Sequence, residues 1–217
     1  IKKFLYSDHE IFLRELVSNA VDASQKIKRL AALGEYKEEV GKLRVEVEVN
    51  KKKKTISIKD NGIGMTAEEI KKYINQIAFS GAAEFVEKYK DKGEDQQIIG
   101  HFGLGFYSAF MVSKKVEIDT LSFKEGSEPA KWICDGETEF EIKSSKKKTR
   151  GTTITLHIAE DSEEFLEDAR VQSVLDKYGK FLPIPIKFGT KEESVSDGKD
   201  KDDKPKYKTI KKDNIIN

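Results

Sequence analysis

Two runs of strictly alternating residues, LRVEVEV at 43–49 and TISIKD at 55–60, set the strongest limit on how this chain can fold. Alternation of apolar and polar residues has the period of a β-strand with one buried face. Four lysines, at 51–54, separate the two runs. The pattern predicts a β-hairpin whose lysines form a solvated turn, in a sheet that needs a second layer on its apolar face.

Helical periodicity accounts for the apolar residues on either side of this hairpin. Ser7 or Asp8 can cap the first helix, and Gly34 stops it just after Leu33. Thr66 can cap the second helix, with a glutamate three residues later that completes a capping box. The expected helices cover about 8–33, the residues after 66, 103–112 and 163–179.

Five further runs have the composition of strands. They are KVEIDTLSF, AKWICD, EFEIK and GTTITLHI between 115 and 158, and PIPIKFG at 183–189, whose prolines favour an edge. Several helices with six or seven mostly sequential strands predict an α+β fold. Its form is a two-layer sandwich with helices on one face of a mixed, mainly antiparallel sheet.

A change of composition divides the chain near its end. From Thr190 onward, Lys, Asp, Glu and Ser dominate, and such segments cannot bury enough apolar surface to order themselves. We therefore expect one folded domain over 1–189 and a disordered charged linker over 190–217.

The composition excludes several functional classes. Lys and Arg number 40 against 39 Asp and Glu, so a net charge of +1 leaves no strong footprint for nucleic acid or membrane. No apolar run approaches the roughly 18 residues of a membrane span. Cys134 is the single cysteine, which excludes an internal disulfide and fits a reducing cytosol. Because the chain begins with Ile1 and not Met, we expect further sequence upstream.

The segment FLRELVSNAVDA at 12–23 combines a buried helical stripe with a polar row. Glu15, Asn19, Asp22 and Lys26 fall on one side of the helix and border the apolar stripe. A half-exposed flank with ion pairs four residues apart would explain this row. An amide oxygen, however, is a good ligand for a hard cation, and a carboxylate one turn earlier can reach a water near it.

Two glycine loops and one threonine carry further chemistry. In DNGIGM, Asp60 can accept a hydrogen bond from an exocyclic amine while the glycines let backbone approach a flat ring, although a tight turn explains the motif equally well. In GHFGLGF, at 100–106, backbone N–H groups at a helix start can bind phosphate, or the glycines can form a hinge. Thr152 can share a water with Asp60, although β-propensity alone also accounts for it.

The order of these motifs resembles the ATPase superfamily shared by DNA gyrase, histidine kinases, MutL and the heat-shock protein 90 chaperones. FLRELVSNAVDA, DNGIGMT, FSG and GHFGLGFYSAFMV resemble the N-terminal domain of the heat-shock protein 90 family most closely, in particular its bacterial branch. The resemblance extends to about Gly189.

This resemblance implies a role for each motif residue. Glu15 would orient and deprotonate the attacking water, and Asn19 would ligate Mg²⁺ that bridges the phosphates. Asp60 would accept from the adenine amine, with Gly64 and Thr152 completing a water network. The remaining implied contacts are the pocket mouth (Asp22, Lys26), the adenine and ribose region (Ala23, Ile58, Met65, Ile74, Phe106) and the phosphate cradle (Gly103, Leu104, Gly105, Phe106).

The resemblance also implies a function. A cytoplasmic chaperone would bind ATP, close a lid over about 81–100 and cycle to fold client proteins, as in a stress response. Its Mg-dependent ATPase would be weak in this fragment, because the family takes its γ-phosphate arginine from a middle domain in a full-length homodimer. Since the family's first strand is missing before Ile1, we expect the fragment to be monomeric.

Three positions depart from the family pattern: Phe79 replaces a usual lysine, Tyr73 an asparagine and His101 a glutamine. These changes affect lid closure and ribose contact. Two other readings stay open, a DNA-coupled ATPase of the gyrase or MutL type and a nucleotide sensor without turnover. The near-zero net charge disfavours the first, and Glu15 disfavours the second because a sensor needs no general base. A histidine kinase is disfavoured because no dimerisation helix with an exposed histidine is evident.

Overall fold

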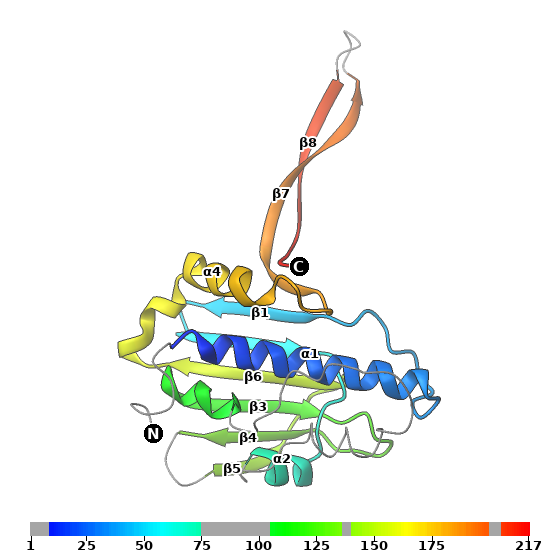
Figure 1. The fold of residues 1–217 in the computed structure, drawn as a ribbon, viewed down its shortest axis with the longest axis vertical. Helices are drawn as coiled ribbons and strands as arrows, with labels where there is room; N and C mark the ends of the chain where they lie inside the picture. The colour runs from blue at the N-terminus through cyan, green and yellow to red at the C-terminus, as the bar shows by residue number, and fades with distance from the viewer. Residues whose placement is uncertain (1–8, 75–104, 136–139, 200–204) are drawn as a thin grey trace.

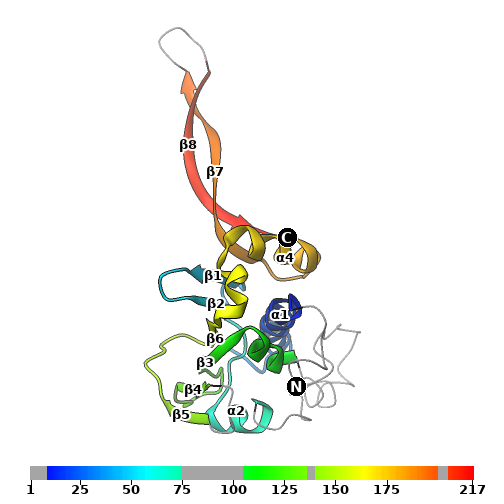
Figure 2. The same ribbon diagram turned by 90° about the vertical axis from the view of Figure 1, so that its left-hand side faces the viewer.

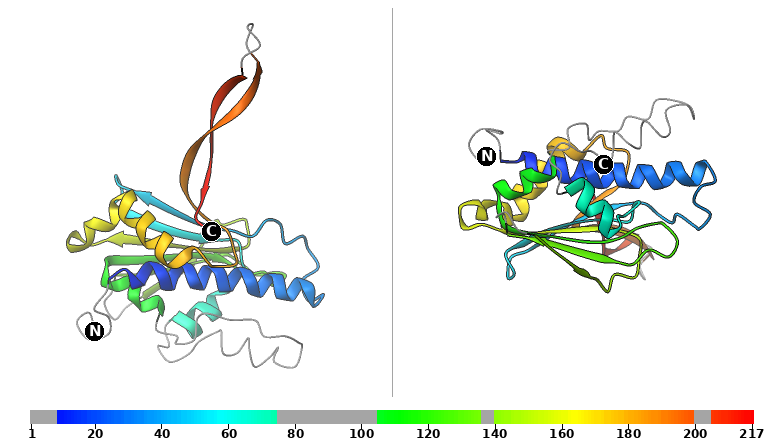
Figure 3. Two further views of the ribbon diagram at one scale, coloured as in Figure 1. Left: turned by 45° about the horizontal axis from the view of Figure 1, so that its top comes forward. Right: turned by 90° about the horizontal axis from the view of Figure 1, so that it is seen from below.

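The computed structural model describes residues 9–74, 105–135, 140–199 and 205–217, whose strands form one sheet covered by helices on one face (Figures 1 and 3). The strands are β1 (Val45–Asn50), β2 (Thr55–Asp60), β3 (Ser113–Leu121), β4 (Ala130–Cys134), β5 (Phe140–Ser144), β6 (Gly151–Ile158), β7 (Ile186–Lys199) and β8 (Pro205–Ile215). The α-helices are α1 (Ile11–Ala32), α2 (Ala67–Ile74) and α4 (Asp168–Gly179), and the 3₁₀ helices are η1 (Gly105–Met111) and η2 (Glu160–Leu166).

The sheet of the described residues has the order β5-β4-β3-β6-β2-β1-β7-β8. Within it β1 and β7 are parallel and the other neighbours are antiparallel, which confirms a mixed, mainly antiparallel sheet. The β1–β2 hairpin is also confirmed, with Asn50 opposite Thr55. The insertion of β6 between β2 and β3 aligns the end of β2 with the start of β6.

Helix α1 packs on the covered face of the sheet and runs roughly along its strands (Figures 1 and 2). It supplies many of the buried side chains of the core. Phe12, Leu13 and Leu16 are fully buried, and the ring of Phe12 meets Phe165 edge-on at 5.0 Å between centroids. Burial of each such side chain stabilises the fold by about 1.5–3 kcal/mol. None of the helices in the described ranges is long and apolar enough to cross a membrane.

The ends of α1 agree only in part with expectation. Its last residue is Ala32, and Gly34 adopts a φ of 72°, as a helix stop requires. The residues expected to cap it, Ser7 and Asp8, lie outside the described residues. In the described part the N-cap is Glu10, whose side chain makes no cap hydrogen bond. The Glu10 carboxylate instead pairs with Arg170 at 2.5 Å and with a lysine of α4 at 2.9 Å. Contact with α4 therefore takes the place of a local cap.

The other helices differ from expectation in form. The capping box before α2 is confirmed, since Thr66 N–H donates to Glu69 at 2.8 Å and Glu69 N–H donates to Thr66 Oγ1 at 3.2 Å. The helix expected over 103–112 is the 3₁₀ helix η1 where it is described. The helix expected over 163–179 is divided, because Glu167 is extended, with φ −85° and ψ 123°.

The charged segment after Thr190 corrects two expectations. Residues 190–199 continue β7, and β8 pairs with them to form a ribbon that extends away from the domain (Figure 1). The expected disorder over 190–217 is therefore wrong for the residues described, and β7 lies between β1 and β8 instead of at an edge. Opposite charges face each other across the ribbon, as in Lys208–Asp197 at 2.8 Å and Lys212–Glu193 at 2.9 Å. Such cross-strand pairs favour pairing over repulsion.

The end of the chain returns to the domain beside the start of β7. The Asn217 side chain accepts from Ile186 N–H at 2.9 Å and donates to the carbonyls of Leu182 and Ile184 at 2.5 and 2.9 Å. Ile216 N–H also donates to the Ile186 carbonyl at 2.9 Å. One amide therefore satisfies backbone groups of a proline-containing segment that has few donors of its own.

We expect Asn217→Ala to lower the free energy of unfolding by about 1–2 kcal/mol, since it leaves these backbone groups without their partner. Urea denaturation of the chain would measure this. Asn214→Ala is the matched control, because Asn214 donates only to the Gln172 side chain in the described contacts. Equal losses in the two variants would contradict the role of Asn217.

Candidate functional site

The polar row of α1 lies at the border of the buried stripe, as expected. The Glu15 side chain is 24% exposed, Asn19 is half-buried and Asp22 is 5% exposed. A flank that merely faces solvent does not account for a buried Asp22, because burial of a carboxylate costs free energy unless a partner compensates it. The inner end of the row is therefore part of the packed interior and not a solvated flank.

Glu15 meets the start of the second glycine loop. A Cβ at Gly105 would collide with Glu15 Oε2 and would lie 3.2 Å from Glu15 Cβ, so a side chain here would displace the Glu15 carboxylate. Arg14 donates from Nε and Nη2 to Glu15 Oε1 at 3.0 and 2.6 Å. The expected general base and the expected phosphate-binding backbone are thus in contact.

Lys26 lies among acidic side chains at the other end of the row. Burial lowers the pKa of its ammonium group, and the carboxylates of Asp22 and Glu69 oppose that shift. Glu69 is also held by Lys124 at 2.6 Å. Lys26 is therefore a partly desolvated cation held between acidic side chains of α1 and α2.

The loop after β2 contacts the backbone of α1 directly. A Cβ at Gly62 would collide with the carbonyl group of Ala23, so this approach requires glycine. Ile63 N–H then donates to the Ala23 carbonyl at 3.0 Å. Gly64 has a φ of +65°, and a Cβ there would collide with the Leu121 carbonyl. The backbone of this loop therefore lies directly against the backbone of α1 on one side and of β3 on the other. The glycines of DNGIGM permit this close approach.

Asp60 is buried at the end of β2, with 5% of its surface exposed. Its Oδ1 accepts from Gly62 N–H at 2.8 Å and from Thr152 N–H at 3.3 Å. Burial raises the pKa of the carboxyl to about 6, while those two backbone bonds and the charges of Lys147 and Arg150 act to lower it. Among the described residues Oδ2 accepts no hydrogen bond, so one oxygen is fixed and the other can receive a donor.

Thr152 lies beside Asp60 and opposite Thr120 of β3. The two threonine hydroxyl oxygens are 2.9 Å apart. Thr120 Oγ1 also accepts from Met65 N–H at 3.0 Å and donates to the Gly151 carbonyl at 3.2 Å. Asp60, Thr152 and Met65, all expected at the site, are therefore joined by a residue that was not expected there.

Some of the remaining expected residues are described and pack in or on the core, and the others lie outside the described residues. Ile58 is buried on the same face of β2 as Asp60, and Ile74 packs on the core while its carbonyl accepts from the Tyr107 hydroxyl. The Phe106 ring is buried edge-on against Trp132, at 5.7 Å between centroids. Outside the described residues lie Gly103, Leu104, Phe79, His101 and the expected lid at 81–100.

Thr120 and Arg150 are the functional neighbours that the motifs missed. Thr120 is fully buried, and the signal for it was a polar residue on the apolar face of an alternating strand. Arg150 donates through Nη2 to the carbonyls of Val40 and Asn61, each at 2.9 Å, and so braces the loop after Asp60. Because their partners are far apart in sequence, no local pattern marks these contacts.

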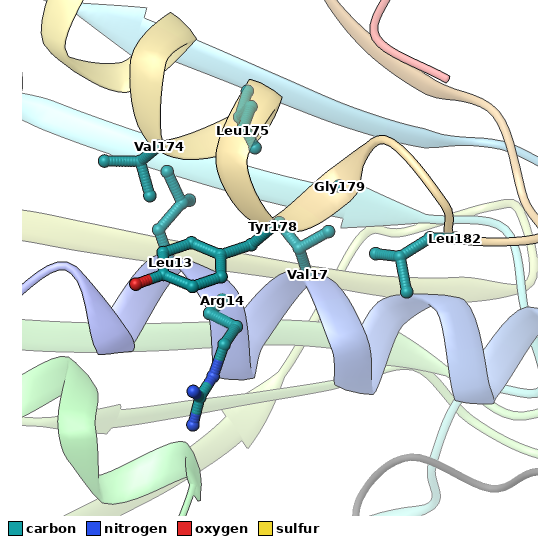
Figure 4. A pocket seen from close by; sticks show the side chains of 8 residues that line it. All are labelled: Leu13, Arg14, Val17, Val174, Leu175, Tyr178, Gly179 and Leu182. Carbon is teal, nitrogen blue, oxygen red and sulfur yellow. The ribbon is translucent and has the colours of Figure 1, made fainter.

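A separate hollow lies between α1 and α4 (Figure 4). Apolar side chains such as Leu13, Val174 and Leu182 line most of it. Arg14 lies at its edge, with the guanidinium 5.8 Å from the centre of the Tyr178 ring. The hollow uses a different face of α1 from the polar row and lacks its converging polar groups.

Comparison with known proteins agrees with this geometry. A profile of the family described as "Histidine kinase-, DNA gyrase B-, and HSP90-like ATPase" matches residues 6–172. Over all 217 residues the chain is 59% identical to the chaperone protein HtpG of Bacteroides fragilis and 60% identical to that of Bacteroides thetaiotaomicron. Over 202 residues, 93% of the chain, it is 57% identical to HtpG of Porphyromonas gingivalis. The chain spans 30% of the length of each Bacteroides relative and 29% of the Porphyromonas relative.

We expect the buried Asp60 to make stability depend on pH. Its pKa of about 6 in the fold lies above the ordinary aspartate value of 3.8, so the folded state binds the proton more tightly. The resulting stability is present below about pH 4 and is lost as pH rises through about 6, a change on the order of 3 kcal/mol.

Asp60→Asn should remove this dependence, because an amide oxygen can still accept both backbone bonds but does not titrate. The difference in unfolding free energy between the wild type and the variant, measured in urea from pH 4 to pH 7, isolates the effect. The wild type should lose stability relative to the variant over that range. A constant difference would contradict a raised pKa.

Proposed function

Since the chain belongs to this ATPase family, as the N-terminal ATPase domain of heat-shock protein 90 chaperones, we propose that the described pocket binds ATP or ADP with Mg²⁺ and hydrolyses ATP. The observation that carries the proposal is the Asp60 carboxylate, buried with one oxygen held by two backbone N–H groups. The second oxygen is then oriented to accept from the exocyclic amine of adenine, and Gly64 and Thr152 complete the polar edge around it.

Glycine lets the loop after β2 pack directly against the helix that carries the polar row. At Gly62 the loop lies against the α1 backbone, so Asp60 at the end of β2 is held close to α1. The half-buried Ala23, Met65 and Ile74 would offer apolar surface to the base, with the fully buried Ile58 packed in the core behind them. A mainly apolar wall with one convergent acid is what a base pocket requires.

The phosphate end of the pocket rests on α1. Asn19 would hold Mg²⁺ through its amide oxygen, and Mg²⁺ between phosphates needs only one or two protein ligands. The backbone of Gly105 and Phe106 would donate to phosphate oxygens, and Glu15 beside it would orient a water and take its proton.

The activity of the whole protein follows from this pocket. ATP binding would close the lid and drive a chaperone cycle on client proteins, with the middle domain of a full-length homodimer completing the catalytic site. The fragment by itself would be monomeric and hydrolyse ATP slowly. A cytoplasmic location fits a chain with one cysteine.

Calorimetric titration with ADP, with and without Mg²⁺, tests the adenine contact. We expect Asp60→Asn to weaken ADP binding at least tenfold, because its amide nitrogen would face the adenine amine with a donor where an acceptor is needed. Asn61→Ala, at a side chain that bonds the Lys42 carbonyl at 2.8 Å, controls for disturbance of the loop. Equal binding by wild type and Asp60→Asn would overturn the pocket.

Glu15→Ala tests turnover. In the full-length protein we expect ATP affinity within a few-fold of wild type and a loss of hydrolysis of about 10²–10⁴-fold, since a general base contributes to the chemical step and little to binding. Glu48→Ala, at an exposed position on β1, is the control. Hydrolysis that persists in Glu15→Ala would remove Glu15 from its role and favour a nucleotide sensor.

A further inference from the structure

Thr120 has three hydrogen-bonding neighbours that place conflicting demands on one hydroxyl. Met65 N–H can only donate to it, at 3.0 Å. The Gly151 carbonyl can only accept from it, at 3.2 Å. The Thr152 hydroxyl, at 2.9 Å, can do either. Thr120 is fully buried, so an unpaired neighbour here would cost free energy.

Only one arrangement of protons satisfies all three neighbours. A hydroxyl has one proton and two lone pairs. Met65 N–H occupies one lone pair of Thr120, and the Gly151 carbonyl takes its proton. The Thr152 hydroxyl must then donate into the second lone pair of Thr120. This commits the Thr152 proton and leaves only lone pairs on Thr152 Oγ1 for the pocket.

We propose that Thr120 is a specificity-determining positioning residue, which fixes the Thr152 hydroxyl as a hydrogen-bond acceptor and so rejects 6-oxopurine nucleotides. The proposal rests on the proposed function, since it concerns the base in the same pocket. Thr120 acts through Thr152 and does not itself touch the nucleotide.

The physical reason is that a hydroxyl free to rotate does not discriminate between a 6-amino and a 6-oxo purine. It can rotate to accept from the amine of adenine or to donate to the carbonyl of hypoxanthine or guanine. Once its proton is committed to Thr120, Thr152 can only accept, either from the base or from a water that it shares with Asp60. A water that donates to both of these acceptors has no proton left for the base. Asp60 Oδ2 beside it is also an acceptor, so a 6-carbonyl would face two acceptors and no donor. Rejection of this kind comes from polar groups that are left unpaired.

The contacts of β6 keep the two acceptors aligned. Thr152 N–H donates to Asp60 Oδ1 at 3.3 Å while the Thr152 hydroxyl is held by Thr120. Thr152 and Thr120 face each other directly in the β3–β6 register. The main chain and the side chain of Thr152 are therefore tied to different strands, and neither can adjust to a wrong base independently.

The test compares diphosphates that differ at position 6 of the purine. Binding of ADP, inosine diphosphate and the diphosphate of purine riboside, which has neither amine nor carbonyl, is titrated by calorimetry with Mg²⁺. The variants are Thr120→Val, which keeps the shape and removes the hydroxyl, and Thr120→Ser, which keeps the hydroxyl. Thr55→Val, at a buried threonine at the far end of β2 from Asp60, is the matched control.

We expect the ratio of the inosine diphosphate Kd to the ADP Kd to fall about tenfold in Thr120→Val, which corresponds to one hydrogen bond that the freed Thr152 can now donate. The purine riboside diphosphate should bind wild type and Thr120→Val within a few-fold of each other. Thr120→Ser and Thr55→Val should keep the wild-type ratio. An unchanged ratio in folded Thr120→Val would overturn the proposal.

A second measurement covers the case in which Thr120→Val does not fold. In wild type, NMR should detect a Thr152 hydroxyl proton that exchanges slowly with water because it is bonded to Thr120. Fast exchange of that proton would overturn the proposal without any variant. If wild type does not bind ADP, or Asp60→Asn binds it equally, the proposed function fails first. Failure of the proposed function would appear as unchanged ADP binding in Asp60→Asn. Failure of the role of Thr120 would appear as an unchanged Kd ratio in Thr120→Val, so the two failures are distinguishable.

Discussion

The backbone contact between helix α1 and the loop after β2 is the constraint on which the site depends. Ile63 donates to the Ala23 carbonyl at 3.0 Å, and its own carbonyl accepts from Phe123 N–H at 2.9 Å. One residue thus connects α1, the loop and the segment after β3. The contact is possible because Gly62 has no side chain to hold the helix away. It brings the helix that carries the polar row and the end of β2, with its acid, close together.

Close to that contact, Asp60 is buried while one oxygen of its carboxylate can still accept a hydrogen bond. Burial raises the pKa of Asp60 to about 6, which disfavours the charged form, while two backbone N–H groups favour it. The balance leaves the carboxylate mainly ionised at neutral pH, with one oxygen fixed and one available. An acid in this position lowers stability at neutral pH. Such local costs are expected at functional sites, in agreement with the binding role that we propose for Asp60.

Local patterns were sufficient for much of the fold. The alternation of 43–60 predicted the β1–β2 hairpin, and Thr66 with Glu69 predicted the capping box, because each depends on residues close in sequence. Patterns failed where distant partners decide. Glu10 binds α4 instead of capping α1, and the charged segment after Thr190 forms strands because its lysines meet acids across β7 and β8. Composition alone counts those charges but not their pairing.

For the site, the sequence by itself determined which chemical groups were present: a carboxylate and an amide on a helix, an acid before glycines, and a threonine at the start of a strand. The order of these groups along the chain also resembled a known family, which implied a role for each of them. Only the tertiary structure decided that β6 lies between β2 and β3, which sets Thr152 against both Asp60 and Thr120. Strand order depends on which apolar faces pack under α1, and that is a property of the whole chain.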